Sequence, residues 1–476
     1  MNIRFARVSL ALGVALACAA AQAAPGSIRE YMASRYQKLT PAEFNKLKSF
    51  VGSTSLKRAT STRDTGAQAD LARFGNANAM AIWGAWEKVE IPGAVCSDGS
   101  PYKIFVMRAN TQYDKLVGND KRLTVEFEPG GACWDYMSCS GQLGMLGAAH
   151  PDGIPDNFMD LNAYLDPRIT GGSPNAVLTP IIMKNHPEGQ SVKTAYWNKV
   201  FLPYCTGDVF VGNKVATYPD PAGSGKTITY RHAGATNMEK VIAWLQQNFN
   251  RPKELLVSGA SAGGAGAQVN YHFIRTALNP EKSTLLNDSG PIFPAPGYGN
   301  QYPLQQKIRE AWNVDYIVGK LDQARPGSGV LRDYGAIATL VADAWPQDKI
   351  AISLFRRDGI YSAYSYARFY GLDPAVPADK EKMLTLWGED LRNLMTQYAS
   401  RPNMSYYIPY YRKLMDSHCV SIIEWNGTEI QAQGVNMGTF VNSLLNDPTT
   451  VSRIEGDNPA DAYVPGFFSE MISLTQ

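Results

Sequence analysis

The stretch LLVSGASAGGAGAQ, residues 255–268, places one hydroxyl, that of Ser261, among glycines and alanines directly after a run of branched apolar residues. Its centre, residues 259–263, fits G-x-S-x-G, a pattern in which the chain turns sharply from a strand into a helix. Side chains two positions to either side of the serine would collide in this turn, so glycine is a steric requirement there. The pattern therefore predicts that Ser261 is a nucleophile, and the alternative is a glycine-rich structural turn with an inert serine.

The segments around this turn predict a parallel sheet. TNMEKVIAWLQQNF (236–249) has apolar residues at helical spacing, KELLVSGA (253–260) reads as a short buried strand, and AQVNYHFIRTAL (267–278) continues as a helix. Helix, strand, turn and helix in this order are typical of an α/β protein. We expect an α/β-hydrolase fold with a mostly parallel central sheet flanked by helices. Earlier strands are expected in KVEIPG (88–93), YKIFVMRA (102–109) and RLTVEFEPGG (122–131).

A nucleophilic serine needs a histidine base, and in the expected fold the order along the chain is serine, acid, histidine. His272 lies in the helix after Ser261, where its side chain points along that helix. His418 remains, in LMDSHCVSIIEW, before an apolar stretch that we expect to be a strand. The alternative for His418 is a structural role. The histidines that precede the serine are excluded by their order, namely His150, His186 and His232.

The acid is less constrained. KIAISLFRRDGIYSAYSYARFYG places Asp358 soon after a predicted strand, where this fold carries its acid. The alternative is a surface charge that forms a solvated ion pair with Arg356 or Arg357. Order alone leaves the choice open among the aspartates between the serine and the histidine, which include Asp343, Asp348, Asp358 and Asp373.

Ester chemistry at such a serine also needs backbone donors for an oxyanion, one from the residue after the serine and one from an earlier glycine-rich loop. Ala262 supplies the first, and Gly131 and Ala132 follow a clear strand pattern. A disulfide between Cys133 and Cys139 would hold this loop rigid. The alternative for the loop is a tight hairpin turn.

Cysteine usage and the first residues indicate export. Arg4 and Arg7 precede a short apolar stretch that ends in a small-residue cleavage pattern, so residues 1–23 predict a signal peptide, with a lipid anchor at Cys18 as the weaker alternative. We expect a secreted or periplasmic protein, with a helical extension over 24–80 and a catalytic domain over 81–476. Five cysteines remain after cleavage, an odd number that predicts at least one thiol outside intramolecular disulfides; the pairing of three is left open, namely Cys96, Cys205 and Cys419.

The charge balance excludes some partners. The 45 basic residues nearly match the 43 acidic ones, giving a net charge of +2 and no reason to expect a nucleic-acid or anionic-membrane partner. After the expected signal peptide no apolar run is long enough for a transmembrane helix, so we expect no stable insertion into a membrane. AGSGKT (222–227) resembles a phosphate loop, but that motif needs glycine where Asp220 stands, and a strand pattern follows it. No metal-ligand spacing is evident either. We expect no metal or cofactor, and the oligomeric state stays open.

Seven motifs in order resemble the pectin acetylesterase family, which includes plant cell-wall deacetylases, Notum-like esterases and many bacterial members. We expect a bacterial member. The motifs span most of residues 80–440, and they are CSDGSPY (96–102), EPGGACWDYMSC (128–139), PYCTGDVFVGNK (203–214), RHAGATNMEKVIAWL (231–245), SGASAGGAGA (258–267), NDSGP (287–291) and the HC pair (418–419).

The resemblance implies that Ser261 is the nucleophile, His418 the base and Asp358 the acid. One position departs from the family: plant and animal members commonly carry tryptophan where this chain has Ala132, so the pocket beside the oxyanion loop should differ in shape. We expect a serine esterase that removes acetyl or short acyl groups from a carbohydrate or another hydroxylated substrate. The alternatives are a lipase or polyester depolymerase on the same scaffold and a non-catalytic secreted glycan-binding protein.

Overall fold

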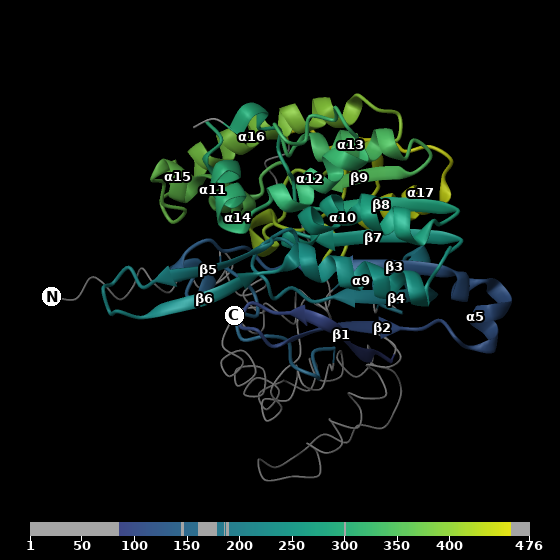
Figure 1. Ribbon diagram of the computed structural model, residues 1–476. Coiled ribbons are helices and arrows are strands. Elements are labelled where there is room, and N and C mark those ends of the chain that lie inside the picture. Colours follow the sequence, from purple (N-terminus) through teal and green to yellow (C-terminus); the bar gives the residue numbers. More distant parts are fainter. Residues whose placement is uncertain are drawn as a thin grey trace, which may run out of the picture.

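A nine-stranded central sheet and a separate two-stranded sheet organise the chain (Figure 1). The expected signal peptide and the helical extension lie outside the described residues, so both stay predictions. The computed structural model describes residues 85–143, 147–159, 179–184, 186, 190–298 and 301–457.

The central sheet has the order β1-β2-β4-β3-β7-β8-β9-β10-β11. Every neighbouring pair from β4 to β11 is parallel, whereas β2 and β1 complete one edge in antiparallel pairing. The sheet is therefore mostly parallel, as expected. The strands are β1 (Glu87–Val95), β2 (Pro101–Met107), β3 (Arg122–Phe127), β4 (Asn198–Leu202), β7 (Glu254–Ala260), β8 (Lys282–Asp288), β9 (Lys349–Ser353), β10 (Met404–Ile408) and β11 (Arg453–Ile454).

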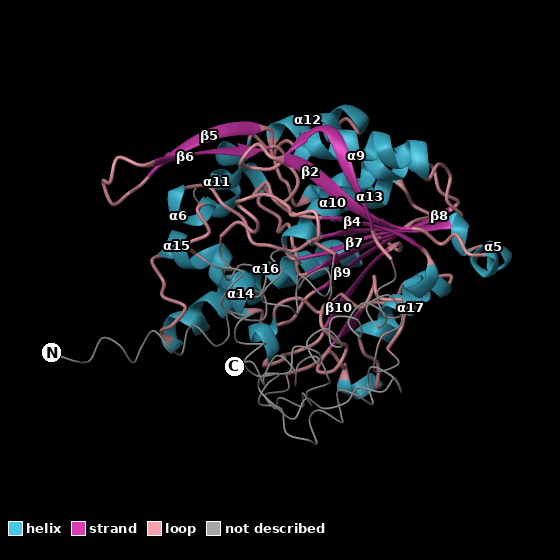
Figure 2. Ribbon diagram, turned by 90° about the horizontal axis from the view of Figure 1, so that it is seen from below, coloured by secondary structure: helices cyan, strands magenta, loops and turns pink. Residues whose placement is uncertain are grey.

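Helices lie on both faces of this sheet. Figure 2 shows α9, α10 and α13 on one side of the strands and α17 on the other. The α-helices are α5 (Gln112–Val117), α6 (Tyr136–Cys139), α9 (Gly234–Asn248), α10 (Ala262–Leu278), α11 (Pro303–Trp312), α12 (Asp315–Ala324), α13 (Ala336–Ala344), α14 (Gly359–Ser362), α15 (Arg368–Tyr370), α16 (Pro377–Ala399) and α17 (Met437–Asn446). Shorter turns are η1 (Asn119–Lys121), η3 (Lys193–Tyr196), η4 (Pro296–Tyr298), η6 (Leu414–Ser417), η7 (Gln431–Gln433) and the π-helical η5 (Ala363–Ala367).

The strand that leads to the sharp turn is buried on both faces. Alternate side chains of a strand point to opposite faces of its sheet. Accordingly, Leu255 and Val257 of β7 belong to one apolar cluster with Ile274 of α10, whereas Leu256 belongs to a second cluster with Phe440 of α17. A continuous apolar run is typical of a central parallel strand covered by helices on both sides. This burial fixes the position of the turn that follows β7.

Most of the sequence-based expectations for the elements are confirmed. The pattern 88–93 lies within β1, the pattern 102–109 overlaps β2, and the pattern 122–131 contains β3. The pattern 236–249 falls within α9 apart from its last residue. The expectation of a strand after His418 is wrong. Backbone donors there bind side chains instead of a neighbouring strand: the Val420 amide donates to Asp288 Oδ1 at 2.9 Å and the Trp425 amide to Gln190 Oε1 at 2.9 Å.

AGSGKT lies at the tip of a hairpin, and it does not form the phosphate loop that the sequence analysis had already rejected. The hairpin joins β5 (Lys214–Pro219) to β6 (Thr227–His232), which pair antiparallel. Asp220 closes the tip, since its carboxylate accepts from the Ala222 amide at 2.9 Å and from the Ser224 hydroxyl. No helix follows the motif, because Thr227 begins β6 directly.

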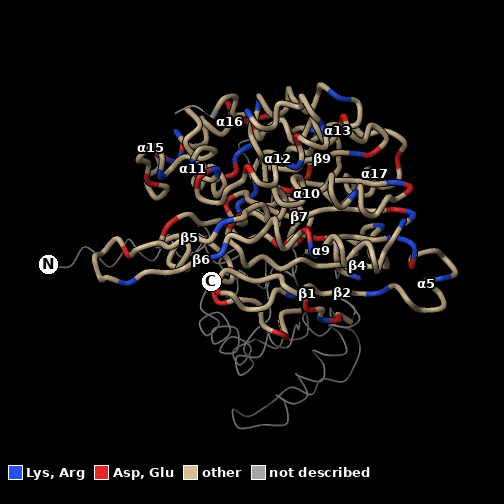
Figure 3. The backbone as a smooth tube through the Cα atoms, in the orientation of Figure 1, with Lys and Arg blue, Asp and Glu red and all other residues tan. Residues whose placement is uncertain are grey.

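Charged side chains are interspersed. Figure 3 shows basic and acidic residues of the described chain distributed among one another along its backbone, as the near-balance of 45 basic and 43 acidic residues predicts. Among the described residues, no helix is both long and apolar enough to cross a membrane.

Candidate active site

The turn after β7 has the steric properties that its sequence predicts. Ser261 adopts φ 52° and ψ −121°, a positive-φ conformation outside the left-handed helical region that is rare for a residue with a side chain. An added Cβ on Gly259 would lie 2.5 Å from the Gly263 carbonyl oxygen, and one on Gly263 would lie 2.1 Å from the Phe127 carbonyl oxygen. Both distances are far inside van der Waals contact, so only glycine fits at these two positions. The serine stands directly before the first residue of α10.

Asp358 and His418, which are 60 residues apart, form a buried pair. The Nδ1 of His418 lies 2.8 Å from the Oδ2 of Asp358, and the two side chains are 3% and 0% exposed. Because a carboxylate only accepts, this contact assigns the donating proton to Nδ1 and leaves Nε2 of the neutral ring as an acceptor. The structure thus brings these two sequence-predicted residues together, with the carboxylate placed to orient the imidazole.

Asp358 is further fixed by the helix it caps. Its Oδ1 accepts from the amides of Ile360 and Tyr361 in the first turn of α14, at 3.1 and 2.8 Å. Burial raises the pKa of the Asp358 carboxyl above its ordinary value, whereas the His418 imidazole and the Tyr361 amide oppose this rise. Two amide donors and an imidazole thus accompany this carboxylate in the interior, which is how buried carboxylates are stabilised.

The geometry distinguishes Asp358 from the other aspartates. Asp343 binds Arg401 near the surface, and Asp348 binds Arg275 in the interior. The alternative, in which Asp358 forms a solvated ion pair with the arginines beside it, does not hold, because its side chain is fully buried. Those two arginines pair elsewhere, namely Arg356 with Asp457 at 2.8 Å and Arg357 with Glu381 at 2.6 Å.

Ser261, Asp358 and His418 lie at the same end of the sheet, because each follows the carboxyl end of a parallel strand. Ser261 directly follows β7, Asp358 follows β9, and His418 follows β10, and these strands are separated only by β8 or adjoin each other. Tyr361 spans the edge: its amide binds Asp358, its hydroxyl donates to the Pro291 carbonyl at 3.0 Å, and its ring centroid lies 6.2 Å from that of His418. The carboxyl ends of parallel strands are the usual place for an active site in such folds.

The glycine-rich loop after β3 lies against the serine turn. An added Cβ on Gly263 would be 2.7 Å from the Glu128 carbonyl oxygen, so the two segments touch. Gly131 has φ 58°, and Ala132 is buried. Within the described part of the chain, the amides of Gly131, Ala132 and Ala262 donate to no protein acceptor. Amides left in this way at a helix N-terminus and a bent loop are suited to bind an oxyanion.

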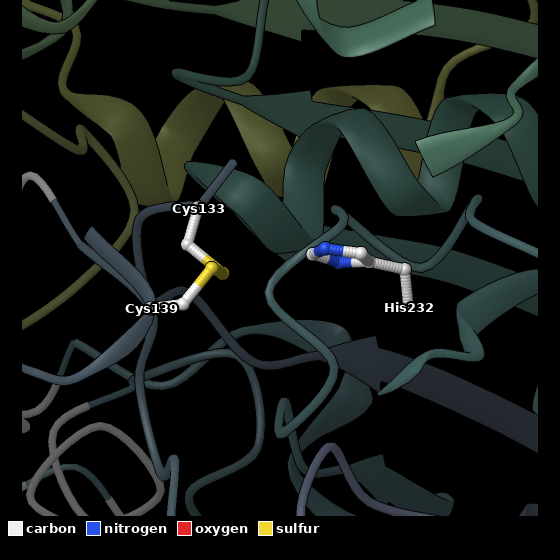
Figure 4. Close-up of side chains that lie close together, drawn as sticks. All are labelled: Cys133, Cys139 and His232. Carbon is white, nitrogen blue, oxygen red and sulfur yellow. A yellow bond between two sulfur atoms is a disulfide. The ribbon is translucent and has the colours of Figure 1, made fainter. Parts of the chain in front are cut away.

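The predicted disulfide between Cys133 and Cys139 is present in this loop. Figure 4 shows it beside His232, whose ring faces the two sulfur atoms. The three side chains come within 4.8 Å of one another, but the sulfur atoms are bonded to each other and do not offer thiolates to a metal. His232 is instead bonded to the Tyr218 hydroxyl at 2.8 Å and faces the Thr206 carbonyl at 3.2 Å. Burial lowers its pKa to about 4.

The structure pairs two of the three cysteines whose disulfide partners the sequence did not determine. Cys96 and Cys205 form a second disulfide across 109 residues. This bond joins the loop between β1 and β2 to the segment after β4. Cys419 is buried, follows His418 directly in the sequence and takes part in neither disulfide. The odd count after signal cleavage had predicted one such thiol.

Two residues of this edge carry no role in the sequence-based analysis. Tyr361 contacts both the acid and the segment after β8, and Asp288 at the end of β8 accepts the Ser261 amide at 2.7 Å through its carbonyl. The motif NDSGP contains Asp288, so the resemblance marked its position without indicating what it does. Tyr361 had no comparable signal beyond its place three residues after Asp358.

A cavity of about 240 Å³ opens beside the candidate site. Its wall includes Ala265, one helical turn after Ser261, together with Pro291 and Tyr361. Most of the remaining lining is apolar or aromatic, for example Ile292 and Tyr364. Cavities of this kind take apolar groups of small molecules.

Comparison with known proteins gives one family and one fold. The pectinacetylesterase family model matches residues 181–327, a segment that contains Ser261 but neither Asp358 nor His418. The palmitoleoyl-protein carboxylesterase Notum of Drosophila melanogaster is 28% identical over 236 residues, which are 46% of this chain and 29% of the relative. Notum of Homo sapiens is 24% identical over 188 residues, which are 38% of this chain and 30% of the relative.

The chain thus spans about 30% of the length of these curated relatives. Among solved structures, that of the Wnt deacylase Notum from Drosophila matches with a TM-score of 0.51 and 17% identity, covering 80% of this chain and 99% of that one. At this identity the likeness concerns the fold alone. Together with the mostly parallel sheet flanked by helices, it confirms the expected α/β-hydrolase fold.

Proposed function

Because the chain belongs to the pectinacetylesterase and Notum-like family, which suggests a carboxylesterase, we propose that it is a secreted serine esterase. It removes acetyl or short acyl groups from a carbohydrate or another hydroxylated substrate. The observation that carries this proposal is the buried contact of 2.8 Å between His418 and Asp358 at the sheet edge where Ser261 occupies a sharp turn with a positive φ angle. Nucleophile, base and acid are the three parts that acyl transfer by serine requires.

The proposed reaction proceeds through an acyl-enzyme. The Oγ of Ser261 attacks the ester carbonyl while Nε2 of His418 accepts the hydroxyl proton. The resulting imidazolium is stabilised by Asp358, and it returns the proton to the departing alcohol when the tetrahedral intermediate collapses. Water then attacks the acyl carbonyl with His418 again as base, which releases the carboxylic acid and restores the serine.

The oxyanion of each intermediate binds to backbone amides. Ala262 offers one at the N-terminus of α10, and Gly131 and Ala132 offer the others. Removal of one such donor from a preorganised site costs about 3 kcal/mol of transition-state stabilisation. The disulfide between Cys133 and Cys139 keeps the loop in place, so these donors need little reorganisation when charge develops.

The nature of the acyl group defines a second candidate function. The cavity of about 240 Å³ beside Ala265 and Tyr361 exceeds what an acetyl group fills, and this favours a lipase or polyester depolymerase on the same scaffold. The curated relatives are named as palmitoleoyl-protein carboxylesterases, which act on a long acyl chain. The family model, by contrast, carries the name pectinacetylesterase. Hydrolysis rates for nitrophenyl esters from acetate to palmitate distinguish the two, since the first function predicts a maximum at the shortest chains.

Export is part of the proposal. Residues 1–23 have the pattern of a signal peptide, and two disulfides are typical of proteins from oxidising compartments. Secretion into the medium or the periplasm agrees with both. Fractionation of expressing cells with detection of the processed N-terminus tests this, and an uncleaved cytosolic chain would contradict it.

Covalent labelling tests the function itself. A fluorophosphonate should label the folded protein, and Ser261→Ala should abolish both labelling and ester hydrolysis. Ser443→Ala serves as the matched control, because this serine lies on α17, where its hydroxyl donates to the Phe440 carbonyl of the same helix. Failure of the wild-type protein to react, or equal labelling of Ser261→Ala, would favour a non-catalytic glycan-binding protein.

A further inference from the structure

Asp288 lies at the centre of the candidate site without touching the reacting atoms. It ends β8, between the strands that lead to Ser261 and to Asp358, and its side chain is 1% exposed. Its carbonyl accepts the Ser261 amide at 2.7 Å. The backbone of this residue therefore directly fixes the turn at residues 259–263, which we call the nucleophile turn.

The carboxylate of Asp288 reaches the two other loops. Oδ1 accepts from the Val420 amide at 2.9 Å and from the Ser353 hydroxyl at 2.9 Å. Oδ2 accepts from the amide of Ser421 at 2.8 Å and from its hydroxyl at 2.7 Å. Val420 follows His418 by two residues, and Ser353 ends the strand that leads to Asp358. One side chain thus binds both the base loop and the acid strand, and a further contact at 3.1 Å comes from the hydroxyl of Ser289.

The base loop, residues 412–426, needs such a contact because its own backbone has little regular structure. Apart from the short turn η6, no helix or strand occurs within it. Met415, Asp416, Ser417 and Cys419 all have positive φ angles between 47° and 61°, so the backbone on both sides of His418 is held in rarely populated conformations. Conformations of this kind persist only where surrounding contacts determine them.

We propose that Asp288 is a positioning residue that sets the distance between the nucleophile turn and the base loop. The inference rests on the proposed function, because it assigns Asp288 to the assembly of that site. Both oxygens of Asp288 accept hydrogen bonds. A carboxylate provides two accepting oxygens, whereas an amide side chain provides only one. In Asp288→Asn one acceptor becomes an NH₂ group, which would face the donors of Ser421 or those of Val420 and Ser353. The base loop then shifts while the fold remains.

The test compares Asp288→Asn with Asp348→Asn. Asp348 is also a buried carboxylate with hydrogen-bonded partners, Arg275 and Tyr271, but it precedes β9 and so lies at the opposite end of the strands. On nitrophenyl acetate, Asp288→Asn should lower kcat about 100-fold with KM changed less than about twofold, because displacement of a catalytic group by about 1 Å has this effect. Asp348→Asn should lower Tm and leave kcat within about twofold.

A second variant keeps the inference testable if Asp288→Asn does not fold. Ser421→Ala removes a single hydroxyl donor, and it should lower kcat and the rate of fluorophosphonate labelling about tenfold while the far-UV spectrum stays unchanged. Unchanged kcat in folded Asp288→Asn, or in Ser421→Ala where the former does not fold, would overturn the inference, as would an equal loss in Asp348→Asn. A wild-type protein that neither hydrolyses esters nor reacts with the fluorophosphonate would refute the proposed function instead.

Discussion

The nucleophile turn and the base loop meet at one sheet edge but are fixed by opposite means. The turn at residues 259–263 is fixed locally, because its glycines touch the neighbouring backbone and a buried strand precedes it. The base loop at 412–426 is held by side chains from distant segments, among them Asp288 and Gln190. A local steric constraint is visible as a sequence pattern, whereas a loop held by distant partners has no pattern of its own.

The largest expected effect comes from a substitution in the nucleophile turn, where the constraint is local. Gly263→Ala places a Cβ 2.1 Å from the Phe127 carbonyl oxygen, so the strand or the turn must move. We expect a loss of at least about 3 kcal/mol in the free energy of unfolding, together with loss of esterase activity. Urea denaturation measures the first and nitrophenyl acetate hydrolysis the second.

The matched control is Gly319→Ala in α12, where an added Cβ meets no atom within 4 Å. This change should stabilise the protein by about 0.5–1 kcal/mol, because alanine loses less conformational freedom in a helix. If both variants unfold at the same urea concentration, steric necessity does not explain the glycines of the turn.

Sequence and structure agree where the determinants are local. Strands β1, β2, β3 and β7 and the sharp turn at Ser261 followed from the sequence pattern, since sterics and apolar periodicity act over a few residues. Four aspartates stayed open, because only the fold shows which of them meets His418. Asp288 carried no predicted role, since its partners Val420 and Ser421 lie 132 and 133 residues away. The strand expected after His418 was wrong because apolar residues there pack around side-chain hydrogen bonds instead of joining the sheet.

The base loop is also held from within, by Arg412, and a substitution there tests this support. Its buried guanidinium donates to the carbonyls of Cys419 at 2.9 Å, Glu424 at 3.1 Å and Asn426 at 3.3 Å. Arg412→Met leaves these carbonyls without that donor, so we expect a loss of about 2–3 kcal/mol in unfolding free energy. Because the loop carries His418, kcat should also fall about tenfold.

Thermal unfolding and steady-state kinetics on the same preparation check both effects. The control is Arg401→Met, which removes an exposed pair with Asp343 and should cost less than about 1 kcal/mol. Stability lost in Arg412→Met with kcat intact would mean that the loop reaches its conformation without this arginine.

The smallest expected effect concerns Glu126, beneath the turn. Burial raises the pKa of this carboxyl to about 8, and the charge of Asp288 adds to the rise, whereas the hydrogen bond from Ser258 opposes it. An unfolded chain releases the proton near pH 4.5, while the folded protein keeps it until about pH 8. Stability from this group is therefore complete below about pH 4.5 and declines as the pH rises towards 8.

Glu126→Gln imitates the protonated carboxyl and should remove this decline. Relative to the wild-type protein, its unfolding free energy should increase by about 2 kcal/mol between about pH 5 and about pH 6.5, since one pH unit in this range corresponds to about 1.4 kcal/mol. Urea midpoints across this range measure the difference. Parallel profiles for the two proteins would show that Glu126 keeps its ordinary pKa in the folded state.

A crystal structure of the protein after reaction with a fluorophosphonate tests the central claim most directly. The account predicts a single adduct on the Oγ of Ser261, with Nε2 of His418 at about 3 Å from a phosphonate oxygen or from Oγ. Its phosphoryl oxygen should accept hydrogen bonds from the amides of Ala262 and Ala132. An adduct on another residue, or an imidazole more than about 5 Å from the serine oxygen, would contradict it.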